Sequence, residues 1–394
     1  MGVIRLYLAL CVIAAHSTVI LPWGMHTGRE AVQIFFIISG FYMALIQQKY
    51  TSSREFFASR FLRIFIPYWC LLILIIGVCT ISGLLFHAWG VLTPYVEYSR
   101  ERNGLGGVFF TAVSNVTLFF QDTVMFCSHD AGERFRFTTA FGTSYFPLWR
   151  YLVMPLAWSV GVELSFYLLV PILAKRRTRT LVLVMLGSIV LRVYAYECLG
   201  LTNDPWTYRF FPFELLLFVA GMVSYRLYAT YKEQAARCFN KWQLNSPKRY
   251  ATYILFALIM FWVANEGQRT LAVWVGDRYA TLISYIGWAT VIPMCFAVSK
   301  DNSVDRLIGE LSYPVYLVHV FAIHTIGLLT KHCGLGKTVD GLLAAIGSFI
   351  GAILVMTVIV APLEKRRVIL ARLIAEKRFH LRAIRQYFRA YRTS

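Results

Sequence analysis

The sequence predicts an all-α protein that crosses a membrane about ten times, with one further short helix that lies in the interface or re-enters the membrane. Hydrophobic residues make up 58% of the 394-residue chain and charged residues only 15%. Apolar runs of 17 or more residues recur over nearly the whole chain, and a helix needs about 20 apolar residues to cross a bilayer. The eight cysteines are dispersed, with neither a C-x-x-C pair nor a metal-binding spacing. We therefore expect no disulfide framework and no metal.

The apolar runs define the expected helices in chain order. The first run has some features of a signal peptide, because Arg5 precedes it and Ala14 and Ala15 offer small residues to a peptidase. The many runs that follow favour an uncleaved anchor. A further apolar segment, 106–120, is short and carries Thr, Ser and Asn side chains, so we expect an interfacial or partly inserted helix there. The expected spans are 3–21, 30–48, 65–87, 154–173, 180–199, 209–229, 250–265, 280–298, 309–330 and 340–362.

The placement of basic residues predicts the orientation. With ten spans and a cytoplasmic N-terminus, 27 of the 39 Lys and Arg residues fall on the cytoplasmic side, as the positive-inside rule requires. The net charge of +19 is then mainly a topology signal, and we expect no nucleic-acid partner. The C-terminal segment, 364–394, reads as a basic amphipathic cytoplasmic tail that anchors to lipid headgroups, with a specific partner site as the alternative. The region 88–153 becomes one long outer segment.

Polar side chains are expected at similar depths inside four spans. Arg5 and His16 are eleven residues apart in the first span, so they share one helix face about 16 Å apart. Ser39 and Glu163 lie about nine and eight residues, or ~13 and ~12 Å, into inward-running helices. His319 falls about ten residues into an outward-running span. Because polar groups at membrane depth are costly and usually functional, we expect His16, Ser39, Glu163 and His319 to line one cavity.

Such a cluster is suited to acid–base chemistry on a neutral nucleophile. An imidazole can take a proton from a hydroxyl, and a carboxylate or arginine can set its tautomer and charge. Covalent chemistry at the imidazole is equally open. Each side chain also has a structural interpretation: His319 as ordinary packing, Ser39 with Gly40 as a small-residue helix contact, and Glu163 as half of a structural pair.

Five motifs, in order along the chain, resemble the acyltransferase-3 family of membrane proteins. They are the arginine and histidine eleven residues apart (Arg5, His16), FFIISGFYM in the second span, SRFLRIFIPYW (Ser59–Trp69), WSVGVELSFYLLVP (Trp158–Pro171) and LSYPVYLVH (Leu311–His319). Members of this family transfer acyl groups, usually acetyl, from coenzyme A to carbohydrates at the bacterial inner membrane. The resemblance covers nearly the whole chain and implies an acyltransferase domain over 1–363.

The resemblance also implies roles for individual residues. His16 is the essential histidine and Arg5 its motif partner. From the shared depth of the polar residues, and not from the resemblance, we expect Glu163 to orient or charge-stabilise His16. Arg60 and Arg63 bind acyl-CoA, and as neighbours on one helix face they are placed to grip its phosphates. Their alternative role is the positive-inside signal. Four further residues of these motifs receive assignments: Ser39 beside the acyl-CoA, and His319, Trp158 and Tyr313 in the pocket.

The predicted function is an integral membrane O-acyltransferase of the plasma (bacterial inner) membrane, with both termini cytoplasmic. It moves an acyl group, in most such proteins acetyl, from cytoplasmic acyl-CoA to a hydroxyl of a sugar in a surface or exported glycan or glycolipid. Its other expected partners are membrane lipids. A transporter or flippase for a glycan or small solute is the alternative, although clear internal repeats and paired helix breaks are not evident.

Overall fold

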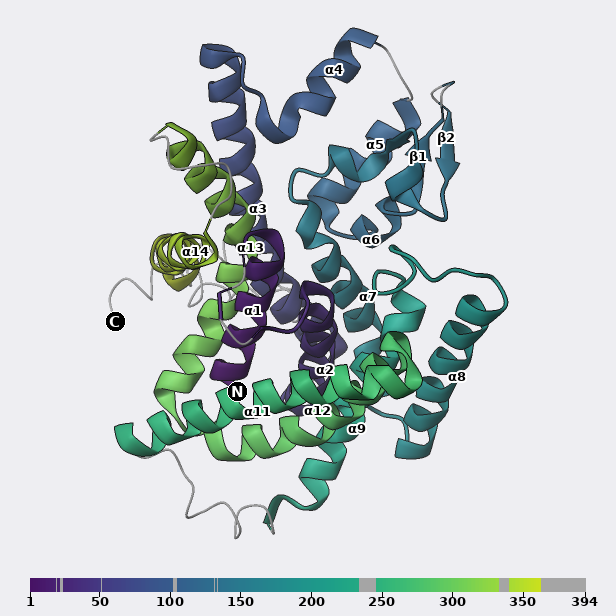
Figure 1. Ribbon diagram of the computed structural model, residues 1–394, viewed down its shortest axis with the longest axis vertical. Helices are drawn as coiled ribbons and strands as arrows, with labels where there is room; N and C mark the ends of the chain where they lie inside the picture. Colours follow the sequence, from purple (N-terminus) through teal and green to yellow (C-terminus); the bar gives the residue numbers. More distant parts are fainter. Residues whose placement is uncertain are drawn as a thin grey trace.

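The computed structural model describes residues 1–18, 20–21, 24–50, 52–101, 105–130, 132, 134–233, 246–332 and 340–362, and these are predominantly helical (Figure 1). The predicted tail at 364–394 lies outside the described residues. The helices are α1 (Gly2–His16), α2 (Gly28–Gln47), α3 (Ser53–Phe86), α4 (Thr93–Glu101), α5 (Leu105–Thr117), α6 (Gln121–Val124), α7 (Trp158–Leu173), α8 (Thr178–Glu197), α9 (Phe211–Thr230), α11 (Pro247–Val275), α12 (Asp277–Ser299), α13 (Ser303–His332) and α14 (Gly341–Val355). The all-α polytopic class is thereby confirmed.

Nine helices within the described ranges are long and apolar enough to cross a membrane: α2, α3, α7, α8, α9, α11, α12, α13 and α14. The first predicted span, 3–21, is shorter than expected. The helix α1 has 15 residues and ends at His16, so its length of ~22 Å is less than the ~30 Å hydrocarbon core. Beyond that end, the Ser17 hydroxyl donates back to the carbonyl of Ile13 (2.8 Å). His16 is therefore the last helical residue.

Two other predicted spans are longer in the structure. The helix α3 begins at Ser53 rather than near residue 65, because the Ser52 side chain caps it by accepting the backbone N–H of Glu55 (3.2 Å). Its first three turns carry Arg60 and Arg63. The helix α11 continues to Val275. In both helices, turns that contain polar residues extend the apolar span. Hydropathy alone does not predict these extra turns.

Two contacts between helix ends and neighbouring elements fix the N-terminal region. The Asp305 carboxylate of α13 accepts the backbone N–H groups of Gly2 (2.7 Å) and Val3 (3.1 Å), which lack partners within α1. Thr27 and Glu30 form a capping box at the start of α2. The first contact places Arg5, one turn into α1, beside α13.

The helices α2 and α9 pack with their backbones in close approach, and α7 also lies against α2. A Cβ atom added at Gly40 would meet the carbonyl oxygen of Phe218 at 1.9 Å, and one at Gly221 would meet that of Ile37 at 2.0 Å. Small residues of this kind allow membrane helices to touch. Gly40 therefore makes the small-residue helix contact that the structural interpretation of Ser39 and Gly40 describes.

The region 88–153, predicted as a long outer segment with one short helix at 106–120, contains α4, α5, α6 and a three-stranded antiparallel sheet in the order β2-β1-β3, with α5 at the place of the predicted short helix. The strands are β1 (Cys127–His129), β2 (Phe135–Phe137) and β3 (Phe146–Pro147), with Ser128 opposite Arg136 and Pro147. In Figure 1, α5, β1 and β2 lie together beside α7. The polar residues of α5 are buried in protein: Asn115 binds the carbonyl of Tyr151 (2.9 Å) and the N–H of Val153 (3.0 Å).

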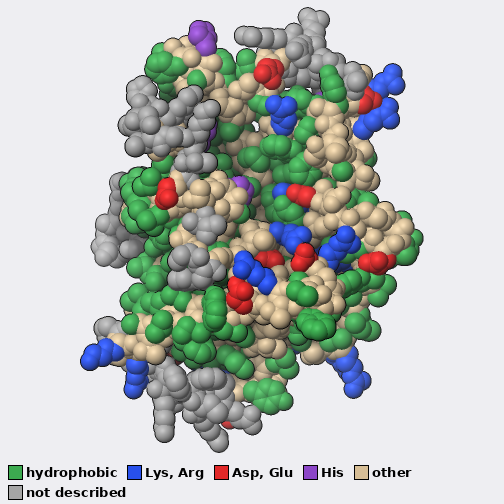
Figure 2. Space-filling model, in the orientation of Figure 1, with side chains coloured by type: hydrophobic (Ala, Val, Ile, Leu, Met, Phe, Trp, Pro, Cys, Tyr) green, Lys and Arg blue, Asp and Glu red, His purple; other side chains and the backbone are tan. Residues whose placement is uncertain are grey.

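Figure 2 shows one face of the molecule. Hydrophobic side chains cover much of it, acidic and basic side chains gather in a band across its middle, and basic side chains lie along its lower edge. In Figure 1 the N-terminus and the paired helices α11 and α12 occupy the lower part of the same view.

Candidate active site

The structure brings His16 of α1 and His319 of α13 together. Their ring centroids are 5.4 Å apart and their planes are inclined by 61°. His319 is fully buried, whereas His16 is exposed. The helices α1 and α13 pack against each other along their lengths, which explains how residues 303 positions apart meet.

A backbone carbonyl sets the tautomer of each ring. His16 Nδ1 lies 2.8 Å from the carbonyl oxygen of Val12, and His319 Nδ1 lies 2.6 Å from that of Tyr316. Because a carbonyl oxygen only accepts, each Nδ1 carries its hydrogen and donates it. In the neutral rings, each Nε2 is therefore left with a lone pair. His319 Nε2 is buried and has no hydrogen-bond partner among the residues that the structure describes. Each ring of the pair therefore keeps one nitrogen, Nε2, with a lone pair.

Glu163 of α7 is held by two hydroxyl groups. Ser39 of α2 and Tyr167 of α7 both donate to its Oε1 atom, the latter at 2.7 Å. The hydrogen bonds of this carboxylate within the described chain thus go to Ser39 and Tyr167 rather than to His16. The expectation that Glu163 itself orients His16 needs this correction: the ring beside His16 is that of His319. The reason is that the register of α7 directs its carboxyl towards α2.

Tyr316 connects the carboxylate to the histidine pair. Its hydroxyl interacts electrostatically with Glu163 and lies 2.7 Å from the Ser159 hydroxyl, while it donates to the carbonyl of Leu156 (2.8 Å). Its ring centroid is 5.6 Å from that of His319. Tyr316 therefore lies between the Ser159 end of α7 and the ring of His319.

Arginine side chains gather at the other end of this arrangement. Arg60 and Arg63 are both close enough to the Tyr167 hydroxyl to interact with it electrostatically. Arg63 also acts on the hydroxyl of Tyr313, which in turn interacts with Glu163. Arg5 and Arg63 act together on the hydroxyl of Tyr42. We call the four residues Tyr42, Tyr167, Tyr313 and Tyr316 the tyrosine tract, because they run between the arginines and the histidine pair.

Arg60 and Arg63 differ in their surroundings. Arg60 is buried, donates to the Tyr50 hydroxyl (2.9 Å) and has its guanidinium carbon 5.9 Å from the centre of that ring. Its Nε atom has no partner within the described part of the chain. Arg63 is exposed, one turn further along α3. Arg63 is thus the more accessible cation.

Trp158, predicted to line the pocket, packs instead against an arginine that the sequence analysis did not single out. The Arg209 guanidinium lies 4.4 Å from the centre of the Trp158 ring. It also pairs with Asp204 (2.7 and 3.0 Å) and with the Tyr208 hydroxyl (2.6 Å). Arg209 acts electrostatically on the Tyr316 hydroxyl. A cation therefore stands near the histidine end of the tyrosine tract. Its position depends on the fold of the segment between α8 and α9, which no periodic pattern reveals.

A second buried polar network lies apart from these residues. Arg192 of α8 pairs with Glu214 of α9 (2.5 Å), which also accepts from Gln33 of α2 (2.9 Å). The Tyr285 hydroxyl of α12 donates to Gln33 (2.5 Å). The network joins four helices through paired charges and an amide, with the Arg192 Nε atom left without a partner among the described residues, and it has the character of a structural element.

Comparisons with known proteins identify the family. The sequence model described as an acyltransferase domain, that of the acyltransferase-3 family, matches residues 1–361. No curated protein and no solved structure matches the chain. Because the match covers nearly all of the sequence, and nine apolar helices within the described residues can span a bilayer, the chain belongs to the acyltransferase-3 family and is an integral membrane acyltransferase.

Proposed function

We propose that this acyltransferase moves an acyl group, typically acetyl, from cytoplasmic acyl-CoA to a hydroxyl of a sugar in a surface or exported glycan. It would act in the bacterial inner membrane with both termini in the cytoplasm. The observation that carries this proposal is the histidine pair, in which carbonyl contacts leave the Nε2 atoms of His16 and His319 free to act as bases. The transporter alternative is set aside because the family is one of acyltransferases.

His16 is the reacting group in this proposal, because it is the accessible member of the pair. In direct transfer, its Nε2 takes the proton of the sugar hydroxyl as the oxygen attacks the thioester carbonyl. The new C–O bond forms, the C–S bond breaks, and the proton passes to the departing thiolate. In the covalent route, His16 Nε2 is itself acylated and the thiolate leaves. The sugar hydroxyl then attacks the acyl-imidazole and gives its proton to His319 Nε2, the new C–O bond forms as the C–N bond breaks, and His319 releases the proton to water while the thiolate takes one up from water.

Arg5, Arg60 and Arg63 form the donor end. Guanidinium groups are suited to phosphates, and all three interact with hydroxyls of the tyrosine tract. The pantetheine arm would extend along that tract towards His16, which lies about 16 Å from Arg5 along α1 by helix geometry. Ser39 donates its hydrogen to Glu163. We therefore assign Ser39 to positioning this carboxylate beside the acyl-CoA.

Replacement of His16 tests the proposal. His16→Ala should lower acyl transfer by about 10²–10⁴-fold, the usual contribution of a general base. The readout is mass spectrometry of surface glycans from cells that lack the gene and carry either the variant or the wild type, at matched membrane expression. His324→Ala is the matched control, since it removes an exposed histidine of α13 outside the pair. Full acylation by the His16 variant would contradict the proposal.

A further inference from the structure

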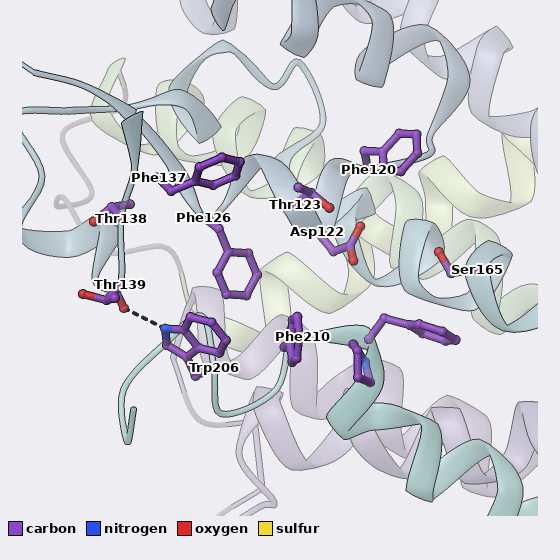
Figure 3. Close-up of a pocket in the computed structure, with 12 residues that line it drawn as sticks. Phe120, Asp122, Thr123, Phe126, Phe137, Thr138, Thr139, Ser165, Trp206 and Phe210 are labelled. Atoms are coloured by element: carbon purple, nitrogen blue, oxygen red, sulfur yellow. Dashed lines mark hydrogen bonds between the residues drawn. The ribbon is translucent and has the colours of Figure 1, made fainter. Parts of the chain in front are cut away.

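A cavity of about 530 Å³ lies outside the histidine pair and the tyrosine tract. Figure 3 shows its lining, which comes from α6 and the following residues, from β2 and the residues after it, from α7, and from the start of α9. Its volume is in the range of about 300–1,000 Å³ that small-ligand sites occupy. Nothing in the reaction proposed above uses it.

Aromatic side chains form most of its walls and are already packed together. Phe126 meets Trp206 edge to face at 4.9 Å, and Trp206 lies 5.2 Å from Phe210. The Trp206 indole N–H donates to the carbonyl of Thr139 (3.1 Å), which fixes the ring (Figure 3). Phe137 is different: it is 75% exposed and lies at the rim. Flat apolar faces held in this way are suited to a ligand that presents C–H groups.

A carboxyl group is buried among these rings. Asp122 is only 8% exposed, and Figure 3 shows its carboxyl directed into the space between Phe126 and Ser165. Within the described part of the chain, no basic side chain forms an ion pair with it. Burial raises the pKa of Asp122 to about 6, opposed by the backbone N–H of Thr123. The backbone N–H groups of Thr123 and of Asp122 itself act on this carboxyl, and its remaining oxygen lone pairs can accept donors that a ligand brings.

These features distinguish between two classes of ligand. An alkyl or isoprenoid chain would satisfy the aromatic walls but offer no hydrogen-bond donor to the Asp122 carboxyl. A sugar ring carries C–H faces for Trp206 and Phe126, and hydroxyl groups that can donate to Asp122. A neutral sugar therefore fits both parts of the lining.

The cavity is connected to the candidate active site by consecutive contacts. Phe210 lines it, and the neighbouring Arg209 acts on the Tyr316 hydroxyl. The Tyr316 ring lies 5.6 Å from His319, whose ring lies 5.4 Å from His16. Arg209 and Tyr316 therefore stand between the cavity and the histidine pair.

We propose that this cavity binds a neutral sugar residue next to the one that is acylated, so that the preferred acceptor contains at least two sugars. The inference rests on the proposed function, because it assumes a glycan acceptor. The residues that carry it are Asp122, Phe126, Phe137 and Trp206, which bind the sugar and take no part in the chemical step.

The test uses the full-length protein in detergent or lipid nanodiscs. The probes are oligosaccharides released by mild acid from the surface glycan of cells that lack the gene, separated into single sugars and chains of two to four. With radiolabelled acetyl-CoA, the wild type should show an acceptor KM at least tenfold lower for the chains than for the single sugars. Asp122→Asn and Phe137→Ala should remove most of that difference, with kcat and the KM for acetyl-CoA unchanged.

Phe109→Ala is the matched control, because Phe109 is a similarly exposed aromatic (71%) of the same region that does not line the cavity. A KM independent of chain length, or variants that behave like this control, would overturn the inference. A lipid that co-purifies with the wild type and is lost from Asp122→Asn would also overturn the inference. Titration calorimetry with the same oligosaccharides distinguishes the sugar-binding cavity from the proposed acyl transfer. If the wild type binds the oligosaccharides, Asp122→Asn abolishes that binding and no acyl transfer is seen, the cavity is supported and the reaction is refuted. Absence of both binding and transfer refutes both.

Discussion

The imidazole rings of His16 and His319 lie 5.4 Å apart, and each donates its Nδ1 hydrogen to a carbonyl three or four residues earlier in its own helix. A histidine that serves only packing usually satisfies both nitrogens when buried. His319 satisfies one, and its second nitrogen has no partner within the described residues. Because its ring also lies beside the exposed His16, we propose that His319 takes part in proton transfer.

Substitution of His319 by leucine separates these two roles. Leucine fills a similar buried volume without leaving a polar atom, so His319→Leu should keep the thermal midpoint within a few degrees of the wild type. We expect kcat for acyl transfer to fall by about 10²-fold, the lower range for a general base. The measurement is acetyl transfer by the purified variant, with His324→Leu as control. Normal kcat in a stable His319→Leu protein would assign this residue to packing.

The second prediction concerns the donor end. Replacing Arg60 and Arg63 together by Gln should weaken acetyl-CoA binding by about 3–6 kcal/mol, because two charged hydrogen-bond donors are lost. Arg63→Gln alone should give about half of this effect without loss of stability, since Arg63 is exposed. Arg60→Gln should also lower the thermal midpoint, since it removes the donor to Tyr50. Isothermal titration with acetyl-CoA measures the affinities.

Arg54→Gln provides the control for charge alone, because it removes an exposed cation from the first turn of the same helix. If all three variants bind acetyl-CoA as the wild type does, the arginines of α3 serve only to orient the protein in the membrane.

The sequence predicted the helices well where apolar length decides the outcome. It missed the first turns of α3 because Ser53–Arg63 mixes charged and apolar residues, and a capping serine rather than hydropathy marks the true start. It missed the sheet because β1 has only three residues, all buried, and so shows no alternation. Short elements held by tertiary contacts leave no periodic signal.

The candidate site was only partly predictable, for a related reason. Helix periodicity and span depth placed Ser39, Glu163 and His319 at comparable levels, but the partner of each depends on how the helices are rotated about their axes. That rotation is set by contacts such as Gly40 against Phe218. It pairs Ser39 with Glu163, and His16 with His319. Arg209 was missed altogether, since its pairing with Asp204 forms in an irregular segment.

The third prediction tests the network of Arg192 and Glu214. Arg192→Met leaves a carboxylate buried without its cation, so it should reduce stability by about 3–5 kcal/mol. The double variant Arg192→Met/Glu214→Gln should be more stable than Arg192→Met, because the unpaired charge is gone while the amide still accepts from Gln33. Thermal unfolding in detergent, followed by circular dichroism, gives the ranking. A double variant less stable than Arg192→Met would show that the pair contributes by its charge.

The last prediction follows from the buried carboxyl of Asp122. Its pKa is raised to about 6 from 3.8 because burial disfavours the charged form. The folded state therefore holds this proton more tightly than the unfolded state does. Ionisation of Asp122 therefore lowers the free energy of unfolding. This loss is absent below about pH 4, grows between about pH 4 and pH 6, and reaches its full value of about 3 kcal/mol above that. Asp122→Asn removes the ionisation, so the variant should unfold at a higher temperature than the wild type at pH 8, with the difference vanishing near pH 4.

Asp130 supplies a control of opposite sign in the same region. Its pKa is lowered, first by the backbone N–H of Arg134 and then by the Arg136 side chain, and it is fully exposed. The ionised form of Asp130 therefore stabilises the fold above its unfolded pKa, and that stabilisation is lost as the pH falls through the lowered value. Asp130→Asn should unfold slightly below the wild type at pH 8. The thermal midpoints of both variants are measured over pH 4–8. If the midpoint of Asp122→Asn at pH 8 is no higher than that of the wild type, the Asp122 carboxyl already has the hydrogen-bond donors that a sugar was proposed to bring.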